Sequence, residues 1–196
     1  DVIKNIKIPL LGLHNIRNAT ASAAVCYSIG VSKQLIKKGL LNFNGVQRRF
    51  SHLFTKDGSQ FFDDYAHHPT EIESVLEGVR NVYKKSRIFC IFQPHRISRF
   101  NSLQKEFSKS FLNADSVLLC PIYKAGENIK PEYSYEQFAN LIIKNSKVKL
   151  ILIKNEIELY KYIRNISFGS KIFIGMGAGS ISNWLKNIKI KLNAIR

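Results

Sequence analysis

The sequence predicts an α/β fold: a Rossmann-like, open and mostly parallel sheet with flanking helices, preceded by a short helical segment. Three observations lead to this fold class. Short apolar runs recur in the second part of the chain, at residues 88–92, 117–120, 148–153 and 171–175. Helix-like sequence alternates with these runs, at residues 102–112, 134–144, 156–164 and 180–190. An Asp-Gly pair between two further runs, Phe50–Thr55 and Gln60–Asp64, predicts a hairpin before them.

Two helices are expected ahead of the sheet and one after the hairpin. Residues 13–27 carry small and apolar side chains with little polar interruption, which predicts a buried helix that Gly30 ends. Ser32 is placed to cap a second helix that runs to about residue 42. That helix has apolar residues on one face: Leu35, Ile36, Leu40 and Leu41. The third helix is expected from Pro69 to about Tyr83.

Composition limits the class of protein. The 196 residues are 45% hydrophobic, and no run approaches the roughly 18 apolar residues of a membrane-spanning helix, so we expect no membrane insertion. The three cysteines lie apart in the sequence without metal-ligand spacing, so we expect no zinc site, no disulfide and a reducing cytoplasm. The net charge of +16 makes a non-enzymatic polyanion-binding module an alternative. The lysines are scattered, however, so nucleic acid is not an expected partner.

Polar residues open the first expected helix. Asn15 and Asn18 are three positions apart, so they share one helix face close to His14. Side-chain amides offer both a donor and an acceptor, which suits the edge of an adenine ring. Capping of the helix by a polar cluster is the alternative that this spacing leaves open.

The densest polar cluster, Phe-Asp-Asp-Tyr-Ala-His-His-Pro-Thr-Glu at residues 62–71, follows an expected strand. Open α/β sheets bind ligands at the carboxyl ends of their strands, so this cluster is a candidate ligand site. His67 and His68 are adjacent and would point in different directions, which makes a shared metal ion a poor interpretation. Thr70 is also suited to cap the helix that begins there.

Two more candidates follow later strands. Arg96 and Arg99 can converge on one carboxylate or phosphate, the alternative being a pair of solvated arginines. The run at residues 175–180 has GxGxG spacing but no acidic residue about 20 positions on, so we expect a tight turn at the sheet edge. No GxxxxGKS or GxxxxGKT loop occurs in the sequence, so the groups that hold the phosphates and Mg²⁺ of ATP in P-loop enzymes are not expected in it.

Five segments, in this order, resemble the Mur ligases. They read Gly-x-His-Asn-x-x-Asn-Ala at residues 12–19, Gly-Val-x-Arg-Arg-Phe at 45–50, Asp-Asp-Tyr-Ala-His-His-Pro-Thr-Glu at 63–71, Phe-Gln-Pro-His-Arg-x-x-Arg at 92–99 and Tyr-x-Ala-Gly-Glu at 123–127. The last two are similar to the members that join L-alanine to UDP-N-acetylmuramate. The nearest alternative is the member that recycles murein tripeptide, which shares the third segment but has a later Glu-Pro-Arg-Ser-Asn pattern. Lys124 and Ser180 stand where the family commonly has Pro and Asn or Asp.

The resemblance implies a three-domain cytoplasmic ligase of peptidoglycan precursor synthesis that uses ATP and Mg²⁺ and forms an acyl phosphate. Residues 1–46 would be the C-terminal end of its central ATP-binding domain and residues 47–196 its C-terminal domain, so the chain alone would be inactive. The residues implied at the nucleotide are His14, Asn15, Asn18, Arg49 and, at the ribose, Asp64. Those implied at the substrates are Tyr65, His67, Arg96 and Arg99. Of these, His67, Arg96 and Arg99 would be catalytic, with His95 orienting its neighbours.

Overall fold

The structure is a computed structural model that describes residues 2–10, 12–45, 47–132 and 134–194. The chain divides into two compact units, Asp1–Gln47 and Arg48–Arg196, and each is described by itself. The assignment of these units to parts of a larger ligase stays a prediction.

The first unit contains a pair of helices, α1 (Leu13–Ser28) and α2 (Lys33–Leu41). The turn between them contains Gly30 with a φ of +89°, a left-handed conformation that favours glycine and ends α1 as expected. The Ser32 hydroxyl accepts a hydrogen bond from the Leu35 amide at 3.3 Å. The expected cap of α2 is therefore confirmed.

The burial expected for α1 is wrong, and the apolar face expected on α2 is largely uncovered. Among the described side chains of α1 only Ala23 is buried, and in α2 only Ile36 is. Val25, Leu35 and Leu41 are exposed, although the sequence pattern places them among apolar neighbours. Two helices alone offer each other a narrow stripe of contact, so the other apolar side chains have no cover within the described part of this unit.

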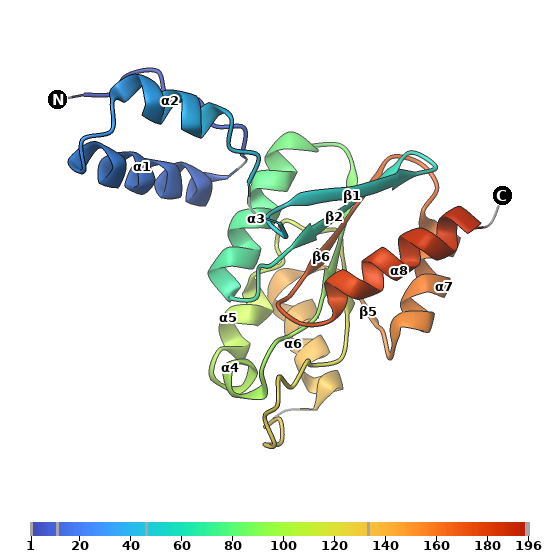
Figure 1. Ribbon diagram of the computed structural model, residues 1–196. Helices are drawn as coiled ribbons and strands as arrows, with labels where there is room; N and C mark the ends of the chain where they lie inside the picture. The colour runs from blue at the N-terminus through green and yellow to red at the C-terminus, as the bar shows by residue number, and fades with distance from the viewer. Residues whose placement is uncertain (1, 11, 46, 133, 195–196) are drawn as a thin grey trace. The chain divides into compact units, whose positions relative to one another are not determined.

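In its described residues the second unit holds a six-stranded sheet with strand order β1-β2-β6-β3-β4-β5 (Figure 1). The strands β1 and β2 are antiparallel, and all other neighbours are parallel. The strands are β1 (Ser51–Lys56), β2 (Ser59–Asp64), β3 (Arg87–Phe92), β4 (Ser116–Leu119), β5 (Lys149–Leu152) and β6 (Lys171–Met176). The helices are α3 (Pro69–Val82), α4 (Ile97–Ser102), α5 (Gln104–Lys109), α6 (Tyr135–Ser146), α7 (Glu156–Ile166) and α8 (Ile181–Ala194). The expected α/β class with a mostly parallel sheet is confirmed.

The strands β1 and β2 form the expected hairpin. Lys56 pairs with Ser59, so Asp57 and Gly58 alone make the turn. Both have positive φ, 49° and 85°, which is the type I′ geometry that Asp-Gly favours and that fits the twist of the strands. The hairpin leads the chain into β2, whose carboxyl end carries the densest polar cluster of the sequence.

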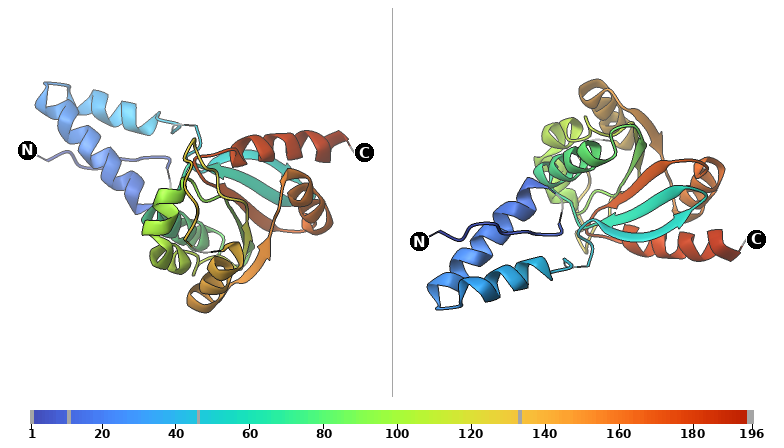
Figure 2. Two further views of the ribbon diagram at one scale, coloured as in Figure 1. Left: turned by 90° about the horizontal axis from the view of Figure 1, so that it is seen from below. Right: turned by 90° about the horizontal axis from the view of Figure 1, so that it is seen from above.

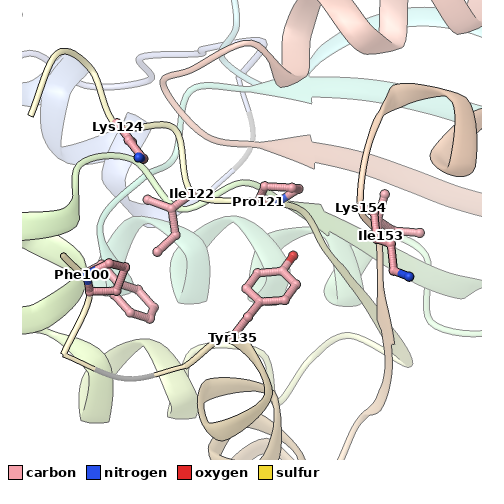
Figure 3. A pocket seen from close by; sticks show the side chains of 8 residues that line it. Phe100, Pro121, Ile122, Lys124, Tyr135, Ile153 and Lys154 are labelled. Carbon is pink, nitrogen blue, oxygen red and sulfur yellow. The ribbon is translucent and has the colours of Figure 1, made fainter. Parts of the chain in front are cut away.

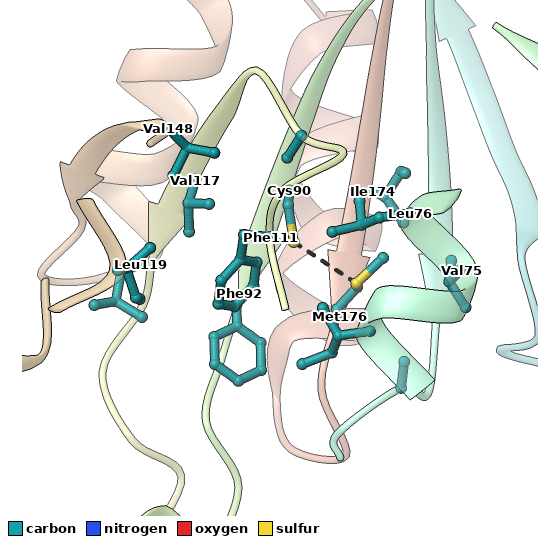
Figure 4. Packing of buried hydrophobic residues seen from close by; sticks show 14 of the residues in the cluster. Val75, Leu76, Cys90, Phe92, Phe111, Val117, Leu119, Val148, Ile174 and Met176 are labelled. Carbon is teal, nitrogen blue, oxygen red and sulfur yellow. Dashed lines mark hydrogen bonds between the residues drawn. The ribbon is translucent and has the colours of Figure 1, made fainter. Parts of the chain in front are cut away.

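Alternating side chains of the central strands build two cores, one on each face of the sheet. On one face Cys90 and Phe92 of β3 and Met176 of β6 pack with α3, α5 and α6 (Figure 4). On the other face Phe89 and Ile91 pack with α7 and α8, and Figure 2 shows these layers from two further sides. Because both faces are covered, the strands read as nearly continuous apolar runs. Burial raises the pKa of the Cys90 thiol, which remains a protonated, apolar filler.

The helix expected at residues 102–112 is wrong in outline. The helix in that range, α5, is shorter than expected, and a second short helix, α4, precedes it, separated from α5 by Leu103 with φ −123° and ψ 21°. Phe100 of α4 meets the Phe138 ring edge to face, with ring centres 4.8 Å apart, whereas Phe107 of α5 meets Phe92 at 5.5 Å. The segment contains no Gly or Pro, so the sequence has no local signal for the break.

Candidate functional site

The carboxyl ends of β2, β6, β3 and β4 lie side by side, because these strands are parallel neighbours. The segments that leave these ends contain the polar cluster after β2, the glycine-rich turn after β6, the arginine pair after β3 and the Tyr-x-Ala-Gly-Glu segment after β4. Motifs that are far apart in the sequence therefore meet at one edge of the sheet. This edge is where open α/β sheets bind ligands.

Asp64 ends β2 with only 2% of its surface exposed. Its two carboxylate oxygens accept hydrogen bonds from the backbone amides of Phe50 and Ala66, both at 2.7 Å. Burial raises the pKa of the Asp64 carboxyl to about 6, while the two amide bonds and the charge of Arg49 oppose the rise. The unit's own backbone thus engages both oxygens, each of which keeps a second lone pair. The ribose contact expected for Asp64 stays a prediction.

Arg48 joins the ends of β2 and β6. Its guanidinium donates to the Gly177 carbonyl, lies 3.4 Å from the Asp63 carboxylate and stacks 4.8 Å from the ring centre of Tyr65. Asp63, 2% exposed, also accepts from the Ser182 hydroxyl at 2.6 Å. Sequence reasoning missed Arg48 as a site residue. The signal that could have found it was its place in the Gly-Val-x-Arg-Arg-Phe segment.

Glu71, in the first turn of α3, organises the two histidines. Its carboxylate accepts from the backbone amides of His67 and His68, at 3.0 and 3.2 Å, and so caps the helix. The His67 Nδ1 lies 2.8 Å from the Tyr65 carbonyl, whereas the His68 Nδ1 lies 2.9 Å from the Thr70 hydroxyl. The two rings thus have different partners. Since α3 begins directly after His68, Thr70 lies in its first turn and is not its N-cap.

Four rings form a row along this edge of the sheet. Tyr65 and His67 meet edge to face with ring centres 5.0 Å apart, and His67 meets His95 in the same way at 5.9 Å. His95 stacks on Tyr123, with ring centres 5.6 Å apart and planes 9° apart. Burial, and then the positive charge of Arg99, lower the pKa of His95. Its ring is therefore mostly neutral near pH 7.

The two arginines after β3 are placed differently. Arg99 lies within α4, and its guanidinium is 3.4 Å from both the ring Nδ1 and the carbonyl of His95. Arg96 precedes α4 with a left-handed φ of 66°, an exposed side chain and a backbone amide that donates to the Tyr123 carbonyl at 2.9 Å. The structure thus brings Arg99 to His95. Convergence of both arginines on one anion stays a prediction.

The glycine-rich turn after β6 packs against the loop after β3. A Cβ on Gly179 would lie 2.5 Å from the Tyr123 ring and 2.6 Å from the Gln93 Oε1. A Cβ on Gly177 would lie 2.6 Å from the Gln93 carbonyl. The Gln93 side chain donates to the Ser180 hydroxyl at 3.1 Å and accepts from the first amide of α8 at 3.0 Å. Close approach of two loops explains these glycines, in agreement with the expected turn at the sheet edge.

Glu127 ties the Tyr-x-Ala-Gly-Glu segment to α4. Its carboxylate accepts from the hydroxyl and the backbone amide of Ser98, at 2.5 and 3.0 Å, and these bonds lower its pKa. Ala125 and Gly126 both have positive φ, 52° and 82°, within the turn that precedes Glu127. The segment therefore holds the start of the helix that carries Arg99.

The expected nucleotide contacts belong to both units. Asn15 and Asn18 lie about one turn apart on α1 and share a face of that helix. The side chain of His14 lies outside the described residues. In the second unit the half-exposed Arg49 is 4.0 Å from the Glu71 carboxylate, a long ion pair. The roles assigned to these residues stay predictions.

Comparisons with known proteins agree with this fold. Residues 48–179 match the family described as Mur ligase, glutamate ligase domain. A UDP-N-acetylmuramate–L-alanine ligase of Pelagibacter ubique is 58% identical over 186 residues, which cover 95% of this chain and 40% of that protein. A crystal structure of a UDP-N-acetylmuramate-alanine ligase from Thermotoga maritima is similar with a TM-score of 0.79 and 27% identity, covering 97% of this chain and 40% of that one. A murein peptide ligase of Psychrobacter arcticus shares the fold at 24% identity, with a TM-score of 0.73 and coverage of 97% and 39%.

The matched proteins are longer than this chain. The chain spans about 40% of the length of the curated relative and of the solved structures that it matches. Across the residues that the structure describes, no helix is long and apolar enough to cross a membrane. The family match covers residues 48–179, which is more than half of the chain and includes every strand of the sheet. The chain therefore belongs to the Mur ligase family.

Proposed function

We propose that the chain is the C-terminal part of an ATP-dependent ligase that joins L-alanine to the carboxylate of UDP-N-acetylmuramate. The observation that carries this proposal is the row of Tyr65, His67, His95 and Tyr123 beside Arg99. The row combines ring nitrogens that can move a proton with a cation that can bind an anionic substrate. The Pelagibacter ubique relative, 58% identical and named for this activity, favours it over tripeptide recycling.

We assign the first unit to the ATP-binding part of the enzyme. Asn15 and Asn18 would bind adenine, and Arg49 would approach the nucleotide. Among the described residues no group of three His, Cys, Asp or Glu side chains could hold a metal ion. The sequence contains no GxxxxGKS or GxxxxGKT loop, so we place the phosphate-binding loop, and with it the Mg²⁺ ligands, in the part of the relatives that this chain does not span. ATP would supply the phosphate that activates the muramate carboxylate.

We assign to His67 the task of taking a proton from the attacking amine. A carbonyl only accepts hydrogen bonds, so the His67 Nδ1, 2.8 Å from the Tyr65 carbonyl, carries the proton of the neutral ring. The Nε2 is then left with a lone pair. The Glu71 carboxylate, 3.6 Å from Nδ1, favours the same tautomer. At neutral pH L-alanine is mainly an ammonium ion, which must lose a proton before its amine can attack. The His67 Nε2 would accept that proton.

Arg99 and Arg96 are the anion-binding groups of the proposal. The contacts of Arg99 with His95 involve one guanidinium nitrogen, Nη1, and leave its other N–H groups for a carboxylate or phosphate. Arg96 is exposed and would reach the same anion with a flexible side chain. Charge neutralisation by two guanidinium groups suits a reaction through an acyl phosphate and a tetrahedral intermediate.

A hybrid enzyme tests this proposal. The 186 matching residues of the Pelagibacter ubique ligase are replaced by the corresponding segment of this chain. We expect the hybrid to form UDP-N-acetylmuramoyl-L-alanine and phosphate at a rate close to that of the unaltered relative. The 196-residue chain alone is the control and should release no phosphate, because its sequence contains no phosphate-binding loop.

Two outcomes would count against the proposal. A folded hybrid that binds ATP but forms no product would show that the edge of this sheet does not support the reaction. A hybrid that uses murein tripeptide in preference to L-alanine would replace the proposal with the recycling activity.

A further inference from the structure

An apolar pocket of about 430 Å³ lies beyond the carboxyl ends of β4 and β5 (Figure 3). Its lining residues come from α4, from the loop after β4, from the segment before α6, from the first residue of α6 and from the segment after β5. Six of these residues are apolar or aromatic, and the other two are lysines. A cavity of this size is ample for a small organic molecule, since ligand pockets are typically ~300–1,000 Å³ and mostly apolar.

The pocket and the candidate site use different sides of the same two segments. In the loop after β4, Tyr123 stacks on His95 in the site, whereas its neighbour Ile122 lines the pocket. On α4, Arg99 contacts His95, whereas its neighbour Phe100 lines the pocket. Consecutive residues of extended chain point to opposite sides, which explains the division after β4. Lys124, the variable position of the Tyr-x-Ala-Gly-Glu segment, is the point where the two adjoin, and the residues to which the site assigns a role do not line this pocket.

The body of the pocket is apolar and uncharged. Phe100 and Ile153 are buried, and Figure 3 shows the Tyr135 ring between them. The Tyr135 hydroxyl donates to the Leu119 carbonyl. Burial raises the pKa of Tyr135 further above its ordinary value, so the ring carries no charge. A flat apolar group therefore fits the middle of the pocket better than a polar one.

The two lysines stand at opposite ends of the pocket. Lys124 lies beside Ile122, and Lys154 lies beside Ile153 (Figure 3). Both are exposed, and in the described part of the chain neither ammonium group has an ion pair. The nearby Glu158 uses its carboxylate to accept the backbone amide of Lys154 at 2.7 Å. An apolar body is thus flanked by two cations that have no anionic partner among the residues that the structure describes.

We propose that this pocket binds a small molecule with a flat apolar middle and a negatively charged group at each end. Carboxylate and phosphate groups are the anions that lysine commonly pairs with in proteins. L-alanine has no apolar middle and is far too small to fill about 430 Å³, so the pocket is not the amino-acid site of the ligase. The proposal is therefore independent of the function proposed above.

Binding of three naphthalene compounds to the 196-residue chain tests the proposal. They are naphthalene-2,6-dicarboxylate, 2-naphthoate and 2-naphthylmethanol, which share one apolar body and carry two, one and no charges. Amide chemical shifts locate the site and give each Kd. We expect the shifts to centre on Ile122, Tyr135 and Lys154, and each added carboxylate to strengthen binding by about fivefold.

Single lysine variants then identify the two ends. Lys124→Ala and Lys154→Ala should each raise the Kd of the dicarboxylate by about fivefold, to the value for 2-naphthoate. Neither change should alter the Kd of 2-naphthylmethanol. The matched control is Lys161→Ala, an exposed lysine of α7 outside the pocket, which should change none of the three affinities. Three outcomes would each overturn the proposal. The chemical shift changes could centre on another part of the chain, the three compounds could bind with equal affinity, or the two lysine variants could bind the dicarboxylate as tightly as the original chain.

Discussion

Arg99 differs from Arg96 in that a neutral ring holds its guanidinium in place, at 3.4 Å from the His95 Nδ1. In the hybrid enzyme Arg99→Ala should lower kcat by about ten- to a hundredfold, the effect of losing a charged hydrogen bond made in the transition state. Arg96→Ala should act in the same direction, and lysine should restore little at either position because an ammonium group lacks the planar two-point contact. The Kd of ATP should not change.

The matched control for these variants is Arg164→Ala, which removes an exposed arginine of α7 and should keep full turnover. If the alanine variants of Arg96 and Arg99 both turned over like the hybrid, the two arginines would be solvated side chains and the substrate site would lie elsewhere.

Asp64 carries a pH dependence that follows from its burial. Its pKa is about 6 in the folded protein, against roughly 3.9 in an unfolded chain. Between these values the folded state binds more protons, so the contribution of Asp64 to the free energy of unfolding is fully present below pH 4 and is lost as the pH rises through 6. The expected loss is on the order of 3 kcal/mol. Asp64→Asn has no charge to bury and should lack this part of the pH dependence in urea unfolding.

Two measurements check this prediction. The ¹³C shift of the Asp64 carboxyl carbon should titrate near pH 6, and a midpoint below 4 would contradict the argument. Asp57→Asn, in the exposed turn of the hairpin, is the control and should leave the pH dependence of stability as it is.

Gly179 shows how one missing Cβ determines the position of an aromatic ring. Its φ is not in the left-handed region, so Gly179→Ala adds a clash without backbone strain, with the new Cβ 2.5 Å from the Tyr123 ring. We expect a loss of about 1–3 kcal/mol in stability and a shift of the His95 ring resonances, because His95 stacks on Tyr123. The control, Gly39→Ala, meets nothing within 4 Å and should leave those resonances in place.

At the scale of elements, four phenylalanines stack across four neighbouring strands. The rings of Phe54, Phe61, Phe173 and Phe89 follow one another with centres 4.2, 4.6 and 4.9 Å apart. Phe173 lies in the interior of this row, so Phe173→Ala should cost about 3–5 kcal/mol. The single tryptophan, Trp184, packs against the same core, so urea unfolding followed by its fluorescence measures the loss.

The control for this change is Phe168→Ala, which removes a phenylalanine that is 63% exposed. It should alter stability by no more than about 0.5 kcal/mol. Equal effects of the two substitutions would mean that the stacked row contributes nothing beyond an ordinary surface ring.

The sequence predicts the hairpin turn and the strands because local patterns determine both. Asp57 and Gly58 specify their turn by backbone preference, and alternating or continuous apolar runs mark the strands. The position of β6 between β2 and β3 is a non-local pairing that no short window contains. The break at Leu103 has no Gly or Pro to mark it and accompanies two separate ring contacts, of Phe100 and Phe107.

The candidate site is predictable in its segments but not in its contacts. Strand ends and family resemblance point to His67, Arg96 and Arg99. The stacking of His95 on Tyr123 and the link from Arg48 to the carbonyl after β6 join residues far apart in the chain. Such contacts depend on which strands are neighbours, and the sequence pattern leaves that open.

At the scale of the whole molecule, burial is divided unevenly between the two units. In the described part of the first unit, Ala23 and Ile36 are the buried apolar side chains. The second unit contains both hydrophobic cores. Because apolar burial supplies most of the stability, the first unit should open far more often than the second. The assignment of residues 1–46 to a larger ATP-binding domain leads to the same expectation, because such a piece would lack its parent sheet.

Limited proteolysis measures this difference. Subtilisin at low concentration should cut first before Arg49 and leave a resistant fragment that begins near that residue and ends near residue 196, as identified by mass spectrometry. The reason is that cleavage requires local opening, and the frequency of opening follows the buried apolar surface that opposes it. Phe173→Ala is the control: it weakens the core of the second unit and should shorten the lifetime of the fragment, while the first cut remains as fast as before. Preferred cleavage within residues 85–175 would contradict the argument, because that segment contains β3, β4 and β5 and most of β6.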